Sequence, residues 1–407
     1  MAGEEGIAGT IEFQMSLLLF VALAGYLIAS MINQSAVVGV ILAGIVVGPS
    51  WLGLVTYTDF VSSLAHLGAV VLLFAVGLHF KLEEIARPKY LLIALAGIVF
   101  PWIAGYGVAR MFDFSSDASI FVGTALTATS IAITANVLKE MGKLETQAAK
   151  AIIGAAIIDD VLSLVALSVS ADIVAGTLSA TSVIVIVAKA VAFLVVGALV
   201  GGVFGTRLLH RMDRTRLIGK YPEFIFIFAM MIAFLYSMVA ELIGLSAIVG
   251  SFLAGVSLGR VKLKHAKSFA EGAEYLQMIF ASIFFVSLGV LVDLHAVTSD
   301  LVWFILVVTI VATLTKVIGC GLPAKLTGMT TRDSLIVGFG MSPRGEVAMI
   351  VALIGLNQGL IMQETYVALV LMSLLTTILT PILFRNWLFK EKAGAESDDA
   401  SLIADQG

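Results

Sequence analysis

The stretch IIGAAIIDDVLSLVALSV, from Ile152 to Val169, places two adjacent acids, Asp159 and Asp160, in the middle of an otherwise apolar run. A helix needs about 20 apolar residues to cross roughly 30 Å of hydrocarbon, and a charge at that depth costs at least ~2.5–3.5 kcal/mol. Acids inside a membrane span therefore face protein or a water-filled cavity, where they mark an ion or proton pathway.

The composition of the whole chain is that of a membrane protein. Hydrophobic residues make up 60% of the 407 residues and charged residues 13%, and the mean hydropathy is +1.07. Apolar stretches of spanning length recur along nearly the whole chain and leave no soluble domain. We predict an all-α polytopic protein with about thirteen transmembrane helices, near residues 11–30, 34–50, 60–80, 90–111, 118–138, 146–171, 181–206, 221–240, 244–259, 268–292, 300–321, 333–356 and 364–387.

The two ends of the chain carry little apolar sequence. The start holds Glu4 and Glu5 rather than basic residues, so we expect no removable signal peptide. The end, EKAGAESDDASLIADQG from Glu391, is acidic and rich in small residues, which predicts a disordered cytoplasmic tail over 389–407. The only cysteine, Cys320, lies in an apolar run and is expected to be a buried structural thiol.

The distribution of lysine and arginine predicts the orientation in the membrane. With the N-terminus outside, 20 of the 24 basic residues fall in segments on the inner side. The positive-inside rule therefore places the N-terminus outside and the C-terminus in the cytoplasm, in a multi-pass protein of the plasma membrane.

Six charged residues stand out in the interior of the predicted spans. They are Asp159, Asp160, Lys189, Lys316, Arg344 and Glu346. A single acid and a lysine could form a static buried ion pair. Two adjacent acids opposite one lysine leave one carboxylate outside that pair. Adjacent helix positions are about 100° apart around the axis, so one acid can face a fixed cation while the other faces a cavity. Lys189 has no motif around it and is expected to extend toward the outer interface.

Two spans contain sequences that disfavour a continuous helix. In GTALTATSIAITANVL (123–138), Thr127, Thr129, Ser130 and Thr134 replace the expected apolar residues. In GFGMSPRGEVAM (338–349), glycines surround Pro343. Hydrogen bonding between helices and a simple kink are the alternatives to a break in these two spans.

Short matches relate the two halves of the chain. LAGIVVGPSWLG (42–53) resembles LAGVSLG (253–259), and FAVGLHFKL (74–82) resembles FVSLGVLVDL (285–294). The two disturbed stretches at Thr127 and Met341 also correspond, and the offsets of the three pairs stay between 211 and 214. An odd number of predicted spans separates each matched pair, so the halves run through the membrane in opposite directions. Inverted repeats with interrupted helices in corresponding positions are typical of transporters with an ion site near the midplane.

Four segments carry a family resemblance: TATSIAITANVL (127–138), GAAIIDDV (154–161), TKVIGCG (315–321) and SPRGEVAMIVA (342–352). Over residues 11–388 the chain resembles the monovalent cation:proton antiporter superfamily, and in particular the NapA-like electrogenic bacterial Na⁺/H⁺ antiporters. The resemblance implies the NhaA/NapA-like fold with two crossed discontinuous helices. It also implies one transporter unit over 1–388, a homodimer in the lipid bilayer, whose core helices (about 60–171 and 268–356) move against dimerisation helices (about 11–50 and 181–259).

The resemblance also assigns roles to individual residues. Asp160 would bind cation and proton alternately, and Asp159 would pair with Lys316 when the cation is absent, so that Na⁺ binds at Asp160 and Asp159. Thr129 and Ser130 would belong to the unwound crossing beside the site. Arg344 and Glu346 would be supporting charges that neutralise the partial charges of broken helix ends.

We therefore predict a secondary active Na⁺/H⁺ antiporter that exports Na⁺, or Li⁺, with two protons exchanged per cation. A K⁺/H⁺ antiporter, a K⁺ efflux protein and a passive cation channel are the alternatives, because carboxylate and hydroxyl oxygens suit all these ions. The sequence has no G-x-x-x-x-G-K-[ST] and no H-E-x-x-H motif. We thus expect no enzymatic activity, no cofactor and no nucleic acid partner.

Overall fold

The computed structural model describes residues 10–80, 87–176, 180–215, 220–221, 223–259, 266–292, 294–297 and 299–389. The regular structure of these residues is helical, which confirms the all-α prediction. Within them, nine helices are long and apolar enough to cross a membrane. They fall in α1 (Ile11–Met31), α3 (Asp59–Gly77), α5 (Pro88–Met111), α8 (Gln147–Ala175), α9 (Ala180–Leu199), α12 (Glu223–Leu242), α14 (Ala266–Val290), α15 (Ser299–Leu326) and α18 (Gln363–Leu383).

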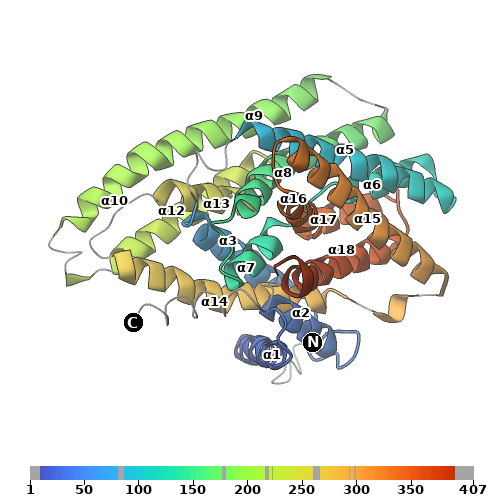
Figure 1. Ribbon diagram of the computed structural model, residues 1–407. Coiled ribbons are helices and arrows are strands. Elements are labelled where there is room, and N and C mark those ends of the chain that lie inside the picture. The colour runs from blue at the N-terminus through green and yellow to red at the C-terminus, as the bar shows by residue number, and fades with distance from the viewer. Residues whose placement is uncertain are drawn as a thin grey trace, which may run out of the picture.

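Shorter helices account for the remaining predicted spans. Two are α2 (Ala36–Val47) and α13 (Ala247–Leu258), and four are half-length, namely α6 (Ser116–Ala125), α7 (Ile131–Glu140), α16 (Thr331–Gly340) and α17 (Glu346–Asn357). The count of thirteen spans stays a prediction, and the expected tail lies outside the described residues from 390 onward. Helix α9 continues through a π-helical turn (Val200–Gly205) into α10 (Thr206–Asp213), and the two form one long helix along the edge of the molecule (Figure 1).

The helices are interrupted at both predicted places. Helix α6 ends at Ala125 and α7 begins at Ile131, and α16 ends at Gly340 before α17 begins at Glu346. The paired starts, 116 with 331 and 131 with 346, are each 215 residues apart. The two interrupted helices thus occupy corresponding positions in the two halves.

Helix packing forms two groups that reflect the repeat. The first bundle consists of α1, α2 and α3 with α12, α13 and α14, and the second bundle consists of α5 to α8 with α15 to α18. Helix α9 contacts both α8 and α13, and α7 of the second bundle touches α2 and α3 of the first.

Glycines allow the closest approaches inside the first bundle. A Cβ added to Gly44 of α2 would lie 2.3 Å from the carbonyl oxygen of Val286 on α14, and one added to Gly255 of α13 would lie 2.3 Å from that of Phe74 on α3. Small residues let membrane helices pack backbone against backbone, where van der Waals contact replaces the missing hydrophobic driving force. These contacts join α2 to α14 and α3 to α13.

Candidate functional site

The two helix interruptions lie against each other. The backbone N–H of Ser130 donates to the carbonyl of Pro343 at 2.8 Å, and the Thr129 hydroxyl donates to the carbonyl of Met341 at 3.2 Å. A Cβ on Gly345 would lie 2.7 Å from Ser130 Oγ, so glycine is needed for this approach. Backbone groups freed in one interrupted helix are therefore satisfied by the other, as burial in a membrane requires.

Arg344 closes the end of α16. Its side chain is 1% exposed, and its guanidinium donates to the carbonyls of Met341, Ser342 and Ala312 at 3.1–3.3 Å. The carbonyls at a helix C-terminus carry partial negative charge, which a cation stabilises. Glu346 is the first residue of α17, where an acid suits the partial positive charge, but its side chain is not among those described.

A buried ion pair joins α8 to α15 beside the interruptions. Lys316 Nζ lies 2.9 Å from Asp159 Oδ1, and both side chains are 0% exposed. Thr129, in the broken segment between α6 and α7, lies close to Asp159. Asp159 is thereby held by the lysine at the edge of the broken segment.

Gly97 of α5 covers this pair, a role that the sequence analysis missed. A Cβ at Gly97 would lie 2.6 Å from Cys320 Sγ, 3.5 Å from Lys316 Nζ and 3.8 Å from Asp159 Oδ1. The glycine lets the α5 backbone pack over the pair, and Cys320 is buried beside it. The only signal in the sequence is a small residue within an apolar span.

Asp160 points elsewhere, as expected for the next residue on a helix. It is 7% exposed and lines a pocket of about 10 Å³, which is room for about one water-sized occupant. Residues of the break between α6 and α7, of α7 itself, of α17 and of α13 in the first bundle line this pocket. Its other lining residues are Thr129, Ser130, Ile131, Ala132, Ile248 and Val347.

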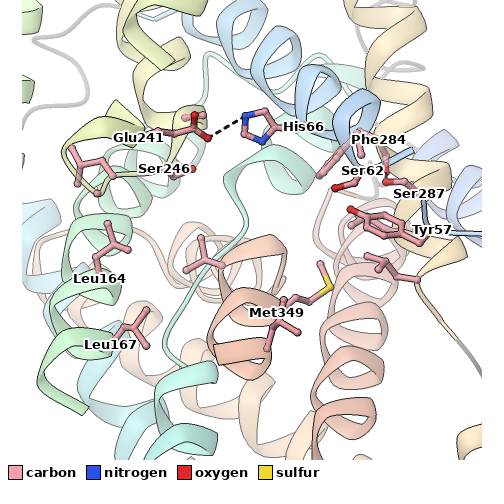
Figure 2. Close-up of a pocket in the computed structure, with 18 of the residues that line it drawn as sticks. Tyr57, Ser62, His66, Leu164, Leu167, Glu241, Ser246, Phe284, Ser287 and Met349 are labelled. Carbon is pink, nitrogen blue, oxygen red and sulfur yellow. Dashed lines mark hydrogen bonds and ion pairs between the residues drawn. The ribbon is translucent and has the colours of Figure 1, made fainter. Parts of the chain in front are cut away.

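A larger cavity of about 590 Å³ adjoins this pocket between the two bundles, and the two share Val347 (Figure 2). Leu164 and Leu167 of α8 line it from the second bundle, and His66 of α3 and Glu241 of α12 line it from the first. His66 Nε2 lies 3.3 Å from Glu241 Oε1, and both side chains are about half exposed. This pair was not singled out from the sequence, since its members lie on separate helices.

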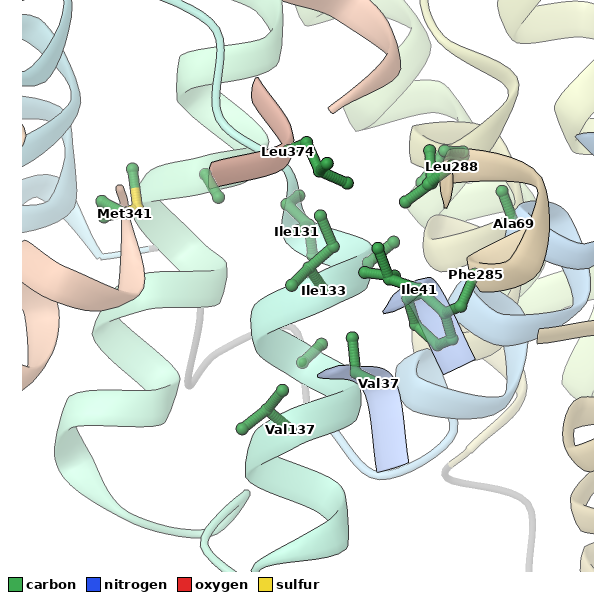
Figure 3. Packing of buried hydrophobic residues seen from close by; sticks show 14 of the residues in the cluster. Val37, Ile41, Ala69, Ile131, Ile133, Val137, Phe285, Leu288, Met341 and Leu374 are labelled. Carbon is green, nitrogen blue, oxygen red and sulfur yellow. The ribbon is translucent and has the colours of Figure 1, made fainter. Parts of the chain in front are cut away.

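The opposite side is closed by contacts between α7 and the first bundle. Figure 3 shows Ile133 of α7 near Ile41 of α2 and Phe285 of α14. Val37 of α2 and Val137 of α7 belong to the same hydrophobic cluster, and all five side chains are buried. These residues lie between the site and the far end of α7, because α7 runs from the site at Ile131 to Glu140.

Polar contacts join the same elements at that far end. Ser35 donates to Glu140 at 2.7 Å, and Gln277 of α14 donates to Asn136 at 3.3 Å and accepts from Lys139. On this side of the site α7 is thus held against α2 and α14, whereas the 590 Å³ cavity lies beside the pocket of Asp160.

The structure thus brings together Asp159, Asp160, Lys316, Thr129, Ser130 and Arg344, together with the backbone of Glu346. Lys189 is not part of this group. It lies exposed on α9 in an apolar groove between α9 and α12.

Three comparisons bear on this arrangement. The profile of the transmembrane sodium/hydrogen exchanger family matches residues 17–390. The chain is 34% identical over 373 residues to the Na⁺/H⁺-K⁺ antiporter GerN of Bacillus cereus, covering 91% of this chain and 94% of GerN. It is 32% identical over 383 residues to a Na⁺/H⁺ antiporter of Enterococcus hirae, covering 92% and 97%. Its fold matches the sodium proton antiporter MjNhaP1 of Methanocaldococcus jannaschii with a TM-score of 0.72 at 16% identity, covering 93% and 96%.

Proposed function

The chain belongs to the sodium/hydrogen exchanger family, and from that premise we propose that it is a Na⁺/H⁺ antiporter in which Asp160 binds Na⁺ and H⁺ in turn. It is a multi-pass membrane transporter rather than an enzyme. The observation that carries the proposal is that the two adjacent acids have different surroundings. Asp159 is held by Lys316, whereas Asp160 lines a pocket that adjoins a large cavity. K⁺ is the second candidate cation, because the name of GerN includes it.

The bundles supply a geometry for alternating access. In our proposal the second bundle, which carries both interruptions and the acid pair, moves against the first bundle. The sequence analysis assigned 60–80 and 268–292 to the moving unit, but α3 packs against α13 and α14 packs against α2, which favours a place for both in the fixed unit. Movement would then separate α7 from α2 and α14 and open the closed side.

The distribution of basic residues supports an orientation with the N-terminus outside. In that orientation the 590 Å³ cavity faces outward, because its mouth is formed near Tyr57, Glu241 and Tyr366, where α3, α12 and α18 begin or end on the outer side. The state described is then outward-facing. We place the antiporter in the plasma membrane as a homodimer, following the family resemblance.

Electrogenic exchange follows from the pairing of Asp159. If Na⁺ displaces a proton from Asp160 and also draws Asp159 away from Lys316, then Lys316 can release a proton as well. Both protons return in the other half of the cycle. Two H⁺ would thus move for each Na⁺, and one net charge would cross per turnover.

The test is cation-driven proton flux in proteoliposomes. Wild-type protein should move protons when Na⁺ is added on one side, and Asp160→Asn should abolish this flux while the protein stays folded. Asp172→Asn, the same substitution nearer the end of α8, is the matched control and should retain it. Retained flux in Asp160→Asn would overturn the role of Asp160, and Na⁺ flux without proton counterflow would indicate a channel.

A further inference from the structure

Two buried oxygen atoms on consecutive turns of α8 have no hydrogen-bond partner. They are Asp159 Oδ2 and Ser163 Oγ. Leaving a buried polar atom unsatisfied costs about 1–3 kcal/mol, so such atoms are uncommon and call for a water, an ion or another explanation. The hydroxyls of Thr129 and Thr134, close to the same site, do donate to carbonyls. Ser163 Oγ differs from these two hydroxyls, and Ser373 Oγ of α18 is the other buried hydroxyl oxygen without a partner among the described residues.

The position of Ser163 on the helix explains what its hydroxyl could reach. Helix α8 is continuous from Gln147 to Ala175. With about 100° and 1.5 Å per residue, Ser163 lies about 60° around the axis and about 4.5 Å along it from Asp160. It lies about 40° and about 6 Å from Asp159. Its direction therefore falls between the two carboxylates, one turn closer to the outer end of the helix.

Ser163 also faces protein rather than lipid, because its side chain is 1% exposed. Ser170, seven residues further along the same face, is equally buried. Its hydroxyl lies 2.6 Å from that of Thr124, with which it shares a hydrogen bond. An unpartnered hydroxyl is thus not a property of this helix face as a whole, and it occurs at the turn next to the acid pair.

We propose that Ser163 Oγ is a ligand of the transported cation, completing a site with the carboxylates of Asp159 and Asp160. The inference rests on the proposed antiport function and deepens it. A cation that leaves water must exchange its hydration oxygens for protein oxygens, and the number and strength of these oxygens set which ion is preferred. A hydroxyl adds one oxygen without adding a charge. When the cation enters, it coordinates both Ser163 Oγ and Asp159 Oδ2. The free energy of ion binding then offsets the loss of the Asp159–Lys316 ion pair.

The test compares Ser163→Ala with Ser163→Thr and Ser170→Ala. Half-saturating Na⁺ should rise roughly tenfold in Ser163→Ala, the effect of losing one contact to a charged group. The ratio of apparent affinities for Na⁺, Li⁺ and K⁺ should change as well, with little change in the maximal rate. Ser163→Thr keeps the hydroxyl and should keep both values near wild type, and Ser170→Ala should too.

A second measurement does not depend on transport. Na⁺ should raise the melting temperature of purified wild-type protein, and Ser163→Ala should need about tenfold more Na⁺ for the same rise. Unchanged half-saturation and unchanged ion selectivity in Ser163→Ala would overturn the proposal, as would a loss of maximal rate alone. If wild-type protein itself exchanges no cation for protons, the proposed function fails, a result distinct from either outcome in the serine variants.

Discussion

Replacing Lys316 with alanine should destabilise the protein far more than the loss of one positive charge at the surface would. Lys316 and Asp159 are both fully buried at 2.9 Å, so removing the lysine strands a carboxylate. Breaking a buried pair in this way costs about 3–5 kcal/mol. Asp159 Oδ1 would lose the ammonium group that donates to it, and Asp159 Oδ2 already has no hydrogen-bond partner.

This energy converts into a shift of the melting temperature. An unfolding entropy of about 2.1 cal/mol/K per residue gives about 0.85 kcal/mol/K for a chain of this length, so the melting temperature should fall by about 4–6 °C. The assay is thermal unfolding of the purified protein in detergent. Lys189→Ala is the matched control, because Lys189 also lies on a spanning helix but is exposed. It should leave the melting temperature nearly unchanged.

A double variant separates the pair from simple loss of packing. Asp159→Asn with Lys316→Gln keeps the shape and allows a neutral hydrogen bond, so it should be more stable than Lys316→Ala. Asp160→Asn replaces a carboxylate with a neutral group of the same shape and leaves the Asp159–Lys316 pair intact, so it should lower the melting temperature less. Equal melting temperatures for Lys316→Ala and Asp160→Asn would refute the reasoning.

Three further predictions follow from the same geometry. With equal pH on both sides, an imposed potential should drive Na⁺ uptake into proteoliposomes, because one net charge couples at about 2.3 kcal/mol per 100 mV; Lys316→Gln should exchange one for one and ignore the potential. Gly97→Ala should destabilise the protein by about 1–3 kcal/mol through overpacking against Cys320 Sγ, as measured by thermal unfolding, and adding Cys320→Ala should restore stability. Ser35→Ala with Asn136→Ala removes two contacts between α7 and the first bundle and the Asn136–Glu140 bond within α7, each worth about 0.5–1.5 kcal/mol, and faster hydrogen exchange in α7 should report the loosened closed side; unchanged exchange would contradict its role in closure.

The sequence by itself determined the membrane architecture and the places where it is disturbed. The length of an apolar segment identifies a span, because a helix hydrogen-bonds its own backbone N–H and C=O groups and can therefore cross hydrocarbon. This requirement is met within each segment. Pro343 and the glycines around it predicted the break between α16 and α17, because proline has no backbone N–H to continue a helix. This reason is also local to the segment. Hydroxyl residues in place of apolar ones at 127–134 predicted the break between α6 and α7, and the offset between the halves related the two breaks.

Adjacent acids could be recognised as functional from sequence, but their different surroundings could not be derived from it. A turn of about 100° requires Asp159 and Asp160 to diverge without saying which faces the lysine. The family resemblance implied the pair with Lys316, and the contact itself joins residues 157 positions apart.

Only the tertiary structure decided which surfaces meet. Gly97 covers the ion pair, the 590 Å³ cavity forms between two bundles, and α7 packs against α2, through contacts between helices distant in sequence. Ser163 became visible only as a hydroxyl without a partner. Hydrophobicity is a property of each segment and can be read one segment at a time. The partner of a buried polar atom depends on how separate helices rotate and approach, which no single segment encodes.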